Sequence, residues 1–289
     1  MPVSTSGHAD PSIDHRIIPG STDMAEPGSE IEDIGPRPTR KAHLWTIRLC
    51  SVVTVFGAWE VFGRQVDPLF MSYPSAIALA AARMIGSGEL LIALESSLQT
   101  LVVAFLIASA IGLSLGLLIG RYRSFEAATD WLVNALYSTP LVAVIPLVIL
   151  WFGLGNTAKI FIVMILAVFP ILINTITGVR NVPANLIDVG TAFASREFEI
   201  FTKIILPSAL PYMMTGLRLG IGRAIIGMVV AEFFTAITGL GALIVKYGNQ
   251  YDTASMFVPI LVLMLLGVTL SLAVRHLEKW IAPWRYSEE

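Results

Sequence analysis

Long apolar runs dominate the sequence, and short polar stretches separate them. Six runs are each about 20 residues long, the length that a helix needs to cross the hydrocarbon core of a bilayer. Two prolines in the third run (Pro140 and Pro146) and one in the fourth (Pro170) predict kinks. The pattern predicts an all-α, polytopic membrane protein with six transmembrane helices. The six runs are Leu44–Phe62, Ser97–Ile119, Trp131–Phe152, Ile160–Gly178, Tyr212–Ile237 and Phe257–Val274.

Composition supports the membrane interpretation and excludes several other classes. Hydrophobic residues make up 55% of the 289-residue chain and charged residues 14%, against roughly 25% charged residues in a soluble domain. A soluble enzyme and a secreted disulfide scaffold are excluded, and a net charge of −2 offers no basic surface for nucleic acid. Cys50 is the single cysteine, and the four histidines have no ligand spacing, so we expect no metal site, cofactor or catalytic group.

The distribution of charge predicts the domains and the orientation. Residues 1–43 are rich in proline, glycine, serine and acid, without the pattern of a signal peptide, which is typical of a disordered tail. With both ends of the chain in the cytoplasm, eleven lysines and arginines lie inside and four lie outside, as the positive-inside rule requires. We therefore expect a cytoplasmic tail over 1–43, a membrane domain over 44–280 and a short cytoplasmic tail over 281–289.

Two segments between the runs are not expected to span. Residues 74–96 have apolar positions at helical spacing and predict an amphipathic helix along the outer interface. Residues 181–208 form a long cytoplasmic loop of mixed polarity. There the pattern predicts two short helices with a break near Ala194–Ser195, and Leu206–Pro207 is expected to end the second helix. Such a pair has more apolar surface than a free loop, so it either packs on the protein's own cytoplasmic ends or docks into a groove on a partner.

Seven residues of this loop follow the spacing E-A-A-x3-G-x9-I-x-L-P, and the loop resembles the cytoplasmic coupling loop of ATP-binding-cassette importer permeases. The I-x-L-P end matches fully, whereas aspartate replaces glutamate, Val-Gly replaces Ala-Ala, and alanine replaces the central glycine. Alanine at that position disfavours a left-handed turn, because its Cβ is strained at positive φ. The seven residues are Asp188, Val189, Gly190, Ala194, Ile204, Leu206 and Pro207.

Three further stretches resemble the nitrate/sulfonate/taurine branch of the same family: Ser72–Ala76, Trp151–Ile160 and Ser208–Glu232. The resemblance covers residues 44–280. It implies the type I importer permease fold in the inner (plasma) membrane of a bacterium, and a second permease copy beside this one, in a homodimer. The chain has no G-x-x-x-x-G-K-[ST] phosphate loop, so it is not expected to be an enzyme.

The resemblance also implies the partners and the activity. A pair of ATPase subunits would hold the coupling loop, and a periplasmic or lipid-anchored binding protein would deliver a small solute, such as a sulfonate, taurine, nitrate or a similar anion. Changing Phe201 or Ile204 to aspartate is expected to abolish association with the ATPase. The alternative is a stand-alone secondary transporter or channel, which would usually show internal repeats and membrane-embedded carboxylates.

Polar residues within the runs are the candidates for the translocation pathway, because an ionisable group in the bilayer is costly. Arg223 would suit an anionic solute or could pair with a carboxylate or carbonyl of another helix, and Glu232 suits helix packing or a gate. Arg218, nearer the cytoplasmic end, is expected to reach the interface in a structural role. The candidates are Tyr137, Ser138, Thr139, Arg223 and Glu232.

Small residues at four-residue spacing predict close helix packing in two of the runs. These residues are Gly112, Gly116 and Gly120 in the second run, and Gly216, Gly220 and Ala224 in the fifth.

Overall fold

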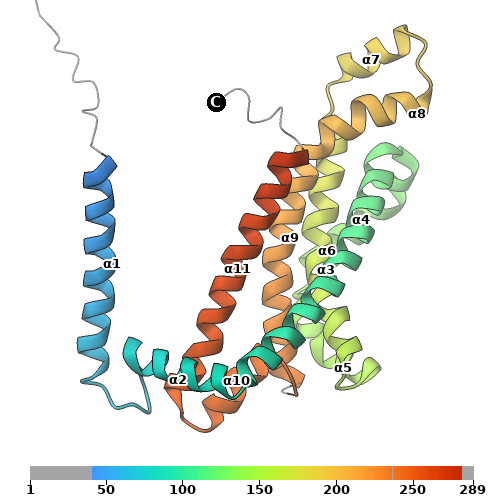
Figure 1. The fold of residues 1–289 in the computed structure, drawn as a ribbon. Coiled ribbons are helices and arrows are strands. Elements are labelled where there is room, and N and C mark those ends of the chain that lie inside the picture. Colours follow the sequence, from blue (N-terminus) through green and yellow to red (C-terminus); the bar gives the residue numbers. More distant parts are fainter. Residues whose placement is uncertain (1–40, 236, 282–289) are drawn as a thin grey trace, which may run out of the picture. The chain divides into compact units, whose positions relative to one another are not determined.

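The computed structural model describes residues 41–235 and 237–281, with side chains from residue 45 onward. The two predicted tails, 1–43 and 281–289, therefore lie almost wholly outside the described residues. The chain divides into two units, Met1–Leu49 and Cys50–Glu289. All regular structure in the described residues is helical (Figure 1). The elements are α1 (Lys41–Gly63), α2 (Pro74–Gly86), α3 (Glu89–Arg121), α4 (Arg123–Ser138), η1 (Leu141–Val144), α5 (Ile145–Phe152), α6 (Asn156–Arg180), α7 (Ala184–Ala192), α8 (Glu197–Ile200), η2 (Phe201–Ile205), α9 (Leu206–Thr235), α10 (Leu240–Asn249) and α11 (Thr253–Ile281).

Four helices are long and apolar enough to cross a membrane on their own, namely α1, α3, α6 and α11. Two bent pairs pass the same test: α4 with residues 141–152, bent by 84°, and residues 197–235 with α10, bent by 47°. The first bend follows Pro140, as the sequence predicts, because proline cannot continue the hydrogen-bonding ladder of α4. The described residues thus contain up to six spans, and the figure of six remains a prediction.

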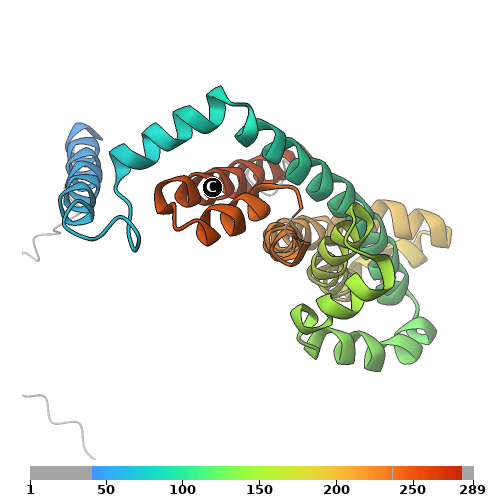
Figure 2. The same ribbon diagram turned by 90° about the horizontal axis from the view of Figure 1, so that it is seen from below.

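The core of the second unit is a row of three helices, α3, α6 and α9, with α6 between the other two (Figures 1 and 2). A Cβ added at Gly112, Gly116 or Gly120 of α3 would lie 2.6–2.8 Å from side-chain atoms of α6. A Cβ at Gly220 of α9 would lie 2.7 Å from Ile171 of α6, the same side chain that a Cβ at Gly112 would meet from α3. The prediction that these glycines allow close helix approach is confirmed.

The prediction of one interfacial helix over 74–96 is wrong in its second half. Helix α2 ends at Gly86, and Gly88 turns the chain in the left-handed conformation with φ +78°. Helix α3 then begins at Glu89, eight residues before the predicted span, and continues to Arg121. The two-residue turn Ser87–Gly88 separates a short apolar helix from a long one, because glycine adopts positive φ without the Cβ penalty.

The prediction that Leu206–Pro207 ends the second loop helix is also wrong. The chain stays helical from Glu197 to Thr235, because a π turn over Phe201–Ile205 joins α8 to α9. The backbone N–H of Leu206 donates to Phe201 O, five residues back. The wider turn gives room ahead of Pro207, whose ring would otherwise clash with a preceding carbonyl.

Candidate functional site

Residues 184–205 form a helical hairpin, which stands beyond the end of α6 and α9 (Figure 1). Helix α7 runs out and α8 with η2 returns, so the pair of short helices predicted from the sequence is present. Gly190 is buried between the two arms, and a Cβ added there would lie 2.9 Å from Ile204 Cδ1 and 3.3 Å from Ile200 Cγ1. A glycine at this position therefore allows α7 to pack directly on the returning arm.

The turn of the hairpin is left-handed at Ala194, where φ is +51°. The sequence placed this turn in doubt because alanine is strained at positive φ, but the turn is present, since local hydrogen bonds hold the strained residue. The Ala194 N–H donates to Thr191 O at 2.9 Å, and the Ser195 N–H donates to Gly190 O at 3.1 Å. The Arg196 N–H donates to Glu199 Oε2 at 3.0 Å and so fixes the start of α8.

The base of the hairpin shares an apolar cluster with the ends of α6 and α9. Ile200 and Ile205 are buried there with Val179, Val182 and Ala209. Of the residues predicted for the coupling loop, Phe201, Ile204 and Leu206 are half-buried against this cluster, and Pro207 is half-buried beside them. These four residues support the hairpin, whereas Asp188, Val189 and Ala194 are exposed.

The free end of the hairpin carries aromatic side chains that the motif does not include. Phe193 is 81% exposed and Phe198 74% exposed, one on each side of the turn, and Val189 adds an apolar side chain that is 53% exposed. We call Val189, Phe193 and Phe198 the hairpin tip. The sequence does show a phenylalanine on either side of the Ala194–Arg196 turn. It does not show that the two side chains are exposed, because that depends on which face of each short helix packs inward.

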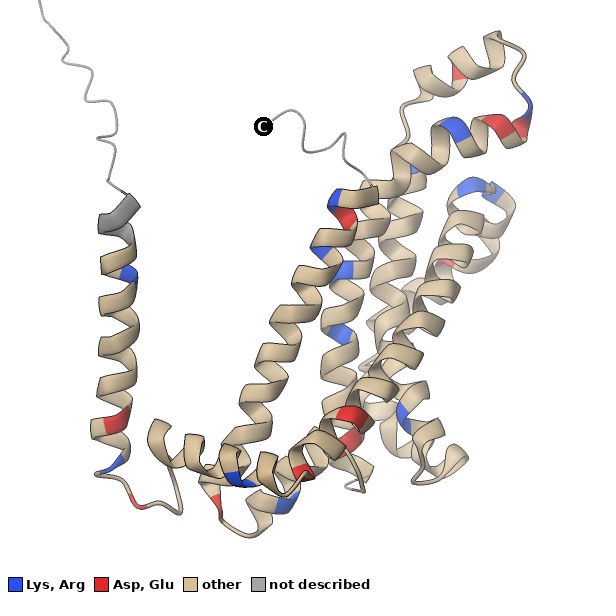
Figure 3. Cartoon of the chain, viewed as in Figure 1, with Lys and Arg blue, Asp and Glu red and all other residues tan. Residues whose placement is uncertain are grey.

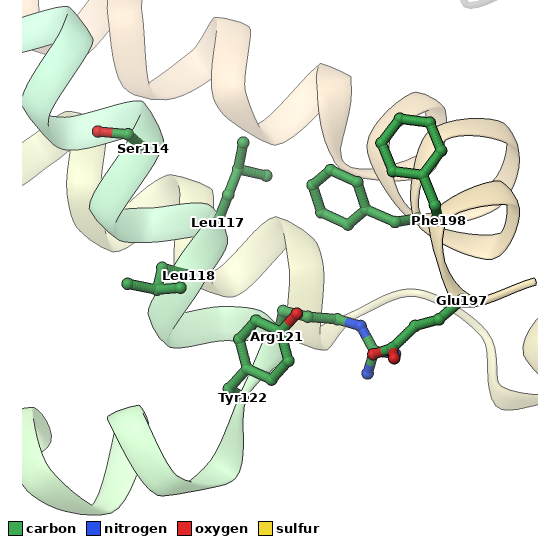
Figure 4. Close-up of a pocket in the computed structure, with 8 residues that line it drawn as sticks. Ser114, Leu117, Leu118, Arg121, Tyr122, Glu197 and Phe198 are labelled. Atoms are coloured by element: carbon green, nitrogen blue, oxygen red, sulfur yellow. The ribbon is translucent and has the colours of Figure 1, made fainter.

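One ion pair ties the hairpin to the neighbouring helix α3. Arg121 Nη2 lies 2.8 Å from Glu197 Oε1, and Arg121 is the last residue of α3 (Figure 4). Within the hairpin, Lys203 pairs with Glu199 at 3.1 Å. The charged residues lie mostly towards the ends of the long helices, where water or lipid headgroups can solvate them (Figure 3).

The predicted pathway residues occupy three separate places. Tyr137, Ser138 and Thr139 are exposed at the end of α4, just before the bend at Pro140. Arg223 is exposed on α9, and no hydrogen bond or ion pair reaches its guanidinium from the described residues. Glu232 lies nine residues further along α9, about 13 Å along the axis, so the structure does not bring it to Arg223.

Glu232 is fully buried, and groups from two other helices, α3 and α10, satisfy its carboxylate. The Ser97 hydroxyl of α3 donates to Oε1 at 2.6 Å, and the Gly241 N–H donates to Oε2 at 2.7 Å. Ser97 Oγ in turn accepts the Leu240 N–H at 2.8 Å. The sequence interpretation missed these partners, because Ser97 lies 135 residues away from Glu232 in the chain.

A buried cation, Lys159, supports the same turn between α9 and α10. Lys159 of α6 is 3% exposed, and its ammonium donates to the carbonyl oxygen and the hydroxyl of Thr238, each at 2.8 Å. Together with the Glu232 contacts, this fixes the start of α10 against α3 and α6. At the other end of α9, Arg218 pairs with buried Glu278 of α11, which gives Arg218 the structural role expected of it.

Comparison with known proteins identifies the family. Residues 108–283, more than half of the chain, match the model of the binding-protein-dependent transport system inner membrane component. The chain belongs to this family. It is 33% identical over 91% of its length to the putative aliphatic sulfonates transport permease protein SsuC of Bacillus subtilis, of which it covers 96%.

Two other relatives carry different solutes in their names. The chain is 27% identical to the taurine transport system permease protein TauC of Escherichia coli, over 82% of this chain and 87% of that protein. It is 31% identical to the nitrate import permease protein NrtB of Leptolyngbya laminosa, over 66% of this chain and 68% of that protein.

Solved structures show the same fold. The inward-facing MetNI methionine ABC transporter contains a chain that superposes with a TM-score of 0.54 at 22% identity, covering 64% of this chain and 93% of that chain. This permease is therefore an inner-membrane subunit of the importer class, with the type I permease fold. Membership of a binding-protein-dependent family removes the support for a stand-alone transporter or channel.

Proposed function

We propose that this permease moves a small anion inward, driven by separate ATPase subunits that hold the hairpin tip. The observation that carries the proposal is the exposure of Phe193 and Phe198 at the free end of a hairpin that is well packed at its base. Exposed aromatic side chains clustered in this way are typical of a protein–protein contact. Since Asp188 and Val189 lie on the outgoing arm, the residues of the family motif would flank the same contact.

The hairpin is built to pass movement to the membrane helices. Gly190 against Ile204 joins its two arms, and the helix continues through η2 into α9. A displacement of the tip would therefore move α9 rather than bend a loop. In this proposal the ATP chemistry belongs to the partner, and the permease needs neither cofactor nor metal of its own.

The orientation and the remaining partners complete the proposal. The positive-inside pattern supports cytoplasmic tails over 1–43 and 281–289, a membrane domain over 44–280 and a cytoplasmic hairpin within 181–208. A periplasmic or lipid-anchored binding protein would then meet the opposite end, where α10 lies. A second copy of the chain would complete the pathway as a homodimer.

The solute class rests on the names of relatives together with Arg223. Several relatives are named for aliphatic sulfonates, taurine, nitrate or bicarbonate, which are small anions or zwitterions with an anionic group, whereas two others are named for formylaminopyrimidine and riboflavin. Arg223 is an exposed cation inside a candidate span, so it would attract such a group. Tyr137, Ser138, Thr139 and Glu232 remain further candidates for the pathway.

The proposal is tested by co-purification of the full-length permease with its cognate ABC ATPase. Phe193→Asp and Phe198→Asp are each expected to reduce the bound ATPase at least about ten-fold, since a buried aromatic contact contributes about 2 kcal/mol or more. Phe70→Asp is the matched control, because Phe70 is 83% exposed in the loop between α1 and α2. Normal ATPase recovery with both tip variants would refute the docking proposal.

A further inference from the structure

A pocket of about 620 Å³ lies between the end of α3 and the returning arm of the hairpin (Figure 4). One wall is a single face of the last two turns of α3, formed by Ser114, Leu117, Leu118 and Arg121. Glu197, Phe198 and Phe201 form the opposite wall, and Tyr122 closes the lower edge. The pocket is therefore apolar along its length and charged at one end.

The position of the pocket favours a lipid over a soluble ligand. Helix α3 has 33 residues and would extend about 50 Å, more than the thickness of the hydrocarbon core, so its end reaches the headgroup layer. Arg121 and Tyr122 at that end are the residue types found where hydrocarbon meets headgroup. Leu117 and Leu118 lie one turn further in, at the depth of acyl chains.

The chemistry of Arg121 favours an anionic headgroup. Its Nη2 pairs with Glu197, but its Nε–H is buried and has no hydrogen-bond partner among the described residues. A buried donor without an acceptor is costly, and a phosphate oxygen would satisfy it. Arg121 and Glu197 are the charged residues that line the pocket, and exposed Arg123 follows two residues after Arg121, where it would add to the attraction for an anionic headgroup.

We propose that this pocket binds one anionic glycerophospholipid. Its phosphate accepts the Arg121 Nε–H, and one acyl chain lies along Leu117, Leu118 and Phe201. The lipid would then fill the space between α3 and the hairpin and hold the returning arm at a fixed distance from the bilayer. The assignment of the lipid to the cytoplasmic leaflet rests on the proposed orientation of the chain. The existence of the pocket does not depend on that orientation.

The test measures lipid retention by the full-length protein in detergent micelles, with native mass spectrometry as the readout. Dioleoyl phosphatidylglycerol is compared with dioleoyl phosphatidylcholine, which has a net neutral headgroup. Both lipids offer a phosphate oxygen to the Arg121 Nε–H, but phosphatidylcholine also brings the choline cation close to the guanidinium. We therefore expect the wild-type chain to retain phosphatidylglycerol about ten-fold more strongly. Arg121→Gln is expected to remove this preference, and Leu117→Trp, which fills the pocket, to reduce retention of both lipids.

Two variants separate lipid binding from a loosened hairpin. Glu197→Gln breaks the same ion pair as Arg121→Gln but keeps the guanidinium, so it is expected to retain phosphatidylglycerol at least as well as the wild type. Arg275→Gln is the matched control, since Arg275 is an exposed arginine of α11. Loss of retention in Glu197→Gln or Arg275→Gln equal to that in Arg121→Gln would overturn the site.

A competition experiment distinguishes a lipid from free phosphate. Excess inorganic phosphate is expected to leave the bound phosphatidylglycerol in place, because the acyl chain contributes to binding; displacement by phosphate would overturn the proposal. The measurement uses no ATPase. Phe198 lines this pocket as well as the tip, whereas Phe193 does not line it, so Phe193→Asp tests ATPase docking separately from the lipid site.

Discussion

The backbone of Gly239 lies so close to the carboxylate of Glu232 that a Cβ added at Gly239 would overlap it. Gly239 also has a φ of +109°, which L-residues with a side chain rarely adopt. We call Ser97, Gly239 and Gly241 the Glu232 cradle. They surround the buried carboxylate, Ser97 and Gly241 hydrogen-bond to it, and together they join α9, α10 and α3 at one point. The buried acid thus serves helix packing, whatever part it takes in transport.

Gly239→Ala should destabilise the fold. We expect it to lower the free energy of unfolding by about 2 kcal/mol or more, through overlap and unfavourable φ together. Thermal unfolding of the full-length protein in detergent would measure the change. Gly222→Ala is the control, because nothing lies within 4 Å of a Cβ added there and Gly222 is within α9. Equal stability of both variants would contradict the cradle.

Gly190→Leu should force the two arms of the hairpin apart. The new side chain would meet Ile204 and Ile200, so we expect amide hydrogen exchange over residues 184–192 to become several-fold faster and solute uptake to fall. Adding Ile204→Ala should restore slow exchange, because it vacates the space that the leucine needs. If the double variant exchanges as fast as Gly190→Leu, the two residues do not pack as described.

Two small substitutions at Ala194 are expected to change the stability of the hairpin in opposite directions. Ala194→Gly should leave the hairpin as stable as before or slightly more stable, because glycine has no Cβ to strain at φ +51°. Ala194→Val should destabilise it by about 1–2 kcal/mol, since β-branching makes positive φ worse. Hydrogen exchange of the Ala194 and Ser195 amides would measure both, and faster exchange in the glycine variant would argue against the left-handed turn.

Arg223→Leu should weaken transport of anions if the guanidinium lines the pathway. We expect the KM for uptake into proteoliposomes, tested with taurine, ethanesulfonate and nitrate, to rise about ten-fold, as the loss of one hydrogen bond to a charged group implies. Arg275→Leu removes an exposed arginine of α11 and should leave KM unchanged. An unchanged KM in Arg223→Leu would return this residue to a structural role.

The sequence predicted those parts of the fold that depend on local pattern. Apolar runs located the four long helices that can cross a membrane on their own, α1, α3, α6 and α11, and small residues at four-residue spacing, such as Gly112 and Gly116, located the face that packs on α6. The hairpin followed from a polar break between two short apolar stretches. In each of these cases the signal lies within one segment of the chain.

The features that the sequence did not predict depend on contacts between distant segments or on backbone alternatives. Pro207 normally favours a helix end, but a π turn before it was an equally available solution. Glu232 could not be placed in a cradle without knowing that Ser97 lies beside it. The exposure of Phe193 and Phe198 could not be predicted, because it depends on which faces of the two hairpin arms pack together through Gly190 and Ile204.

The π turn at Phe201–Ile205 means that one continuously helical stretch, whose axis changes direction between α8 and α9 (Figure 1), carries the tip side chain Phe198 at one end and buried Glu232 near the other. Within α9, rotation about the helix axis turns Arg218 and Arg223 by the same angle, because no break in the helix separates them. Its far end is anchored through Ser97 and Gly241, so torsion applied by a nucleotide-hydrolysing neighbour would emerge as a change in the tilt of α10.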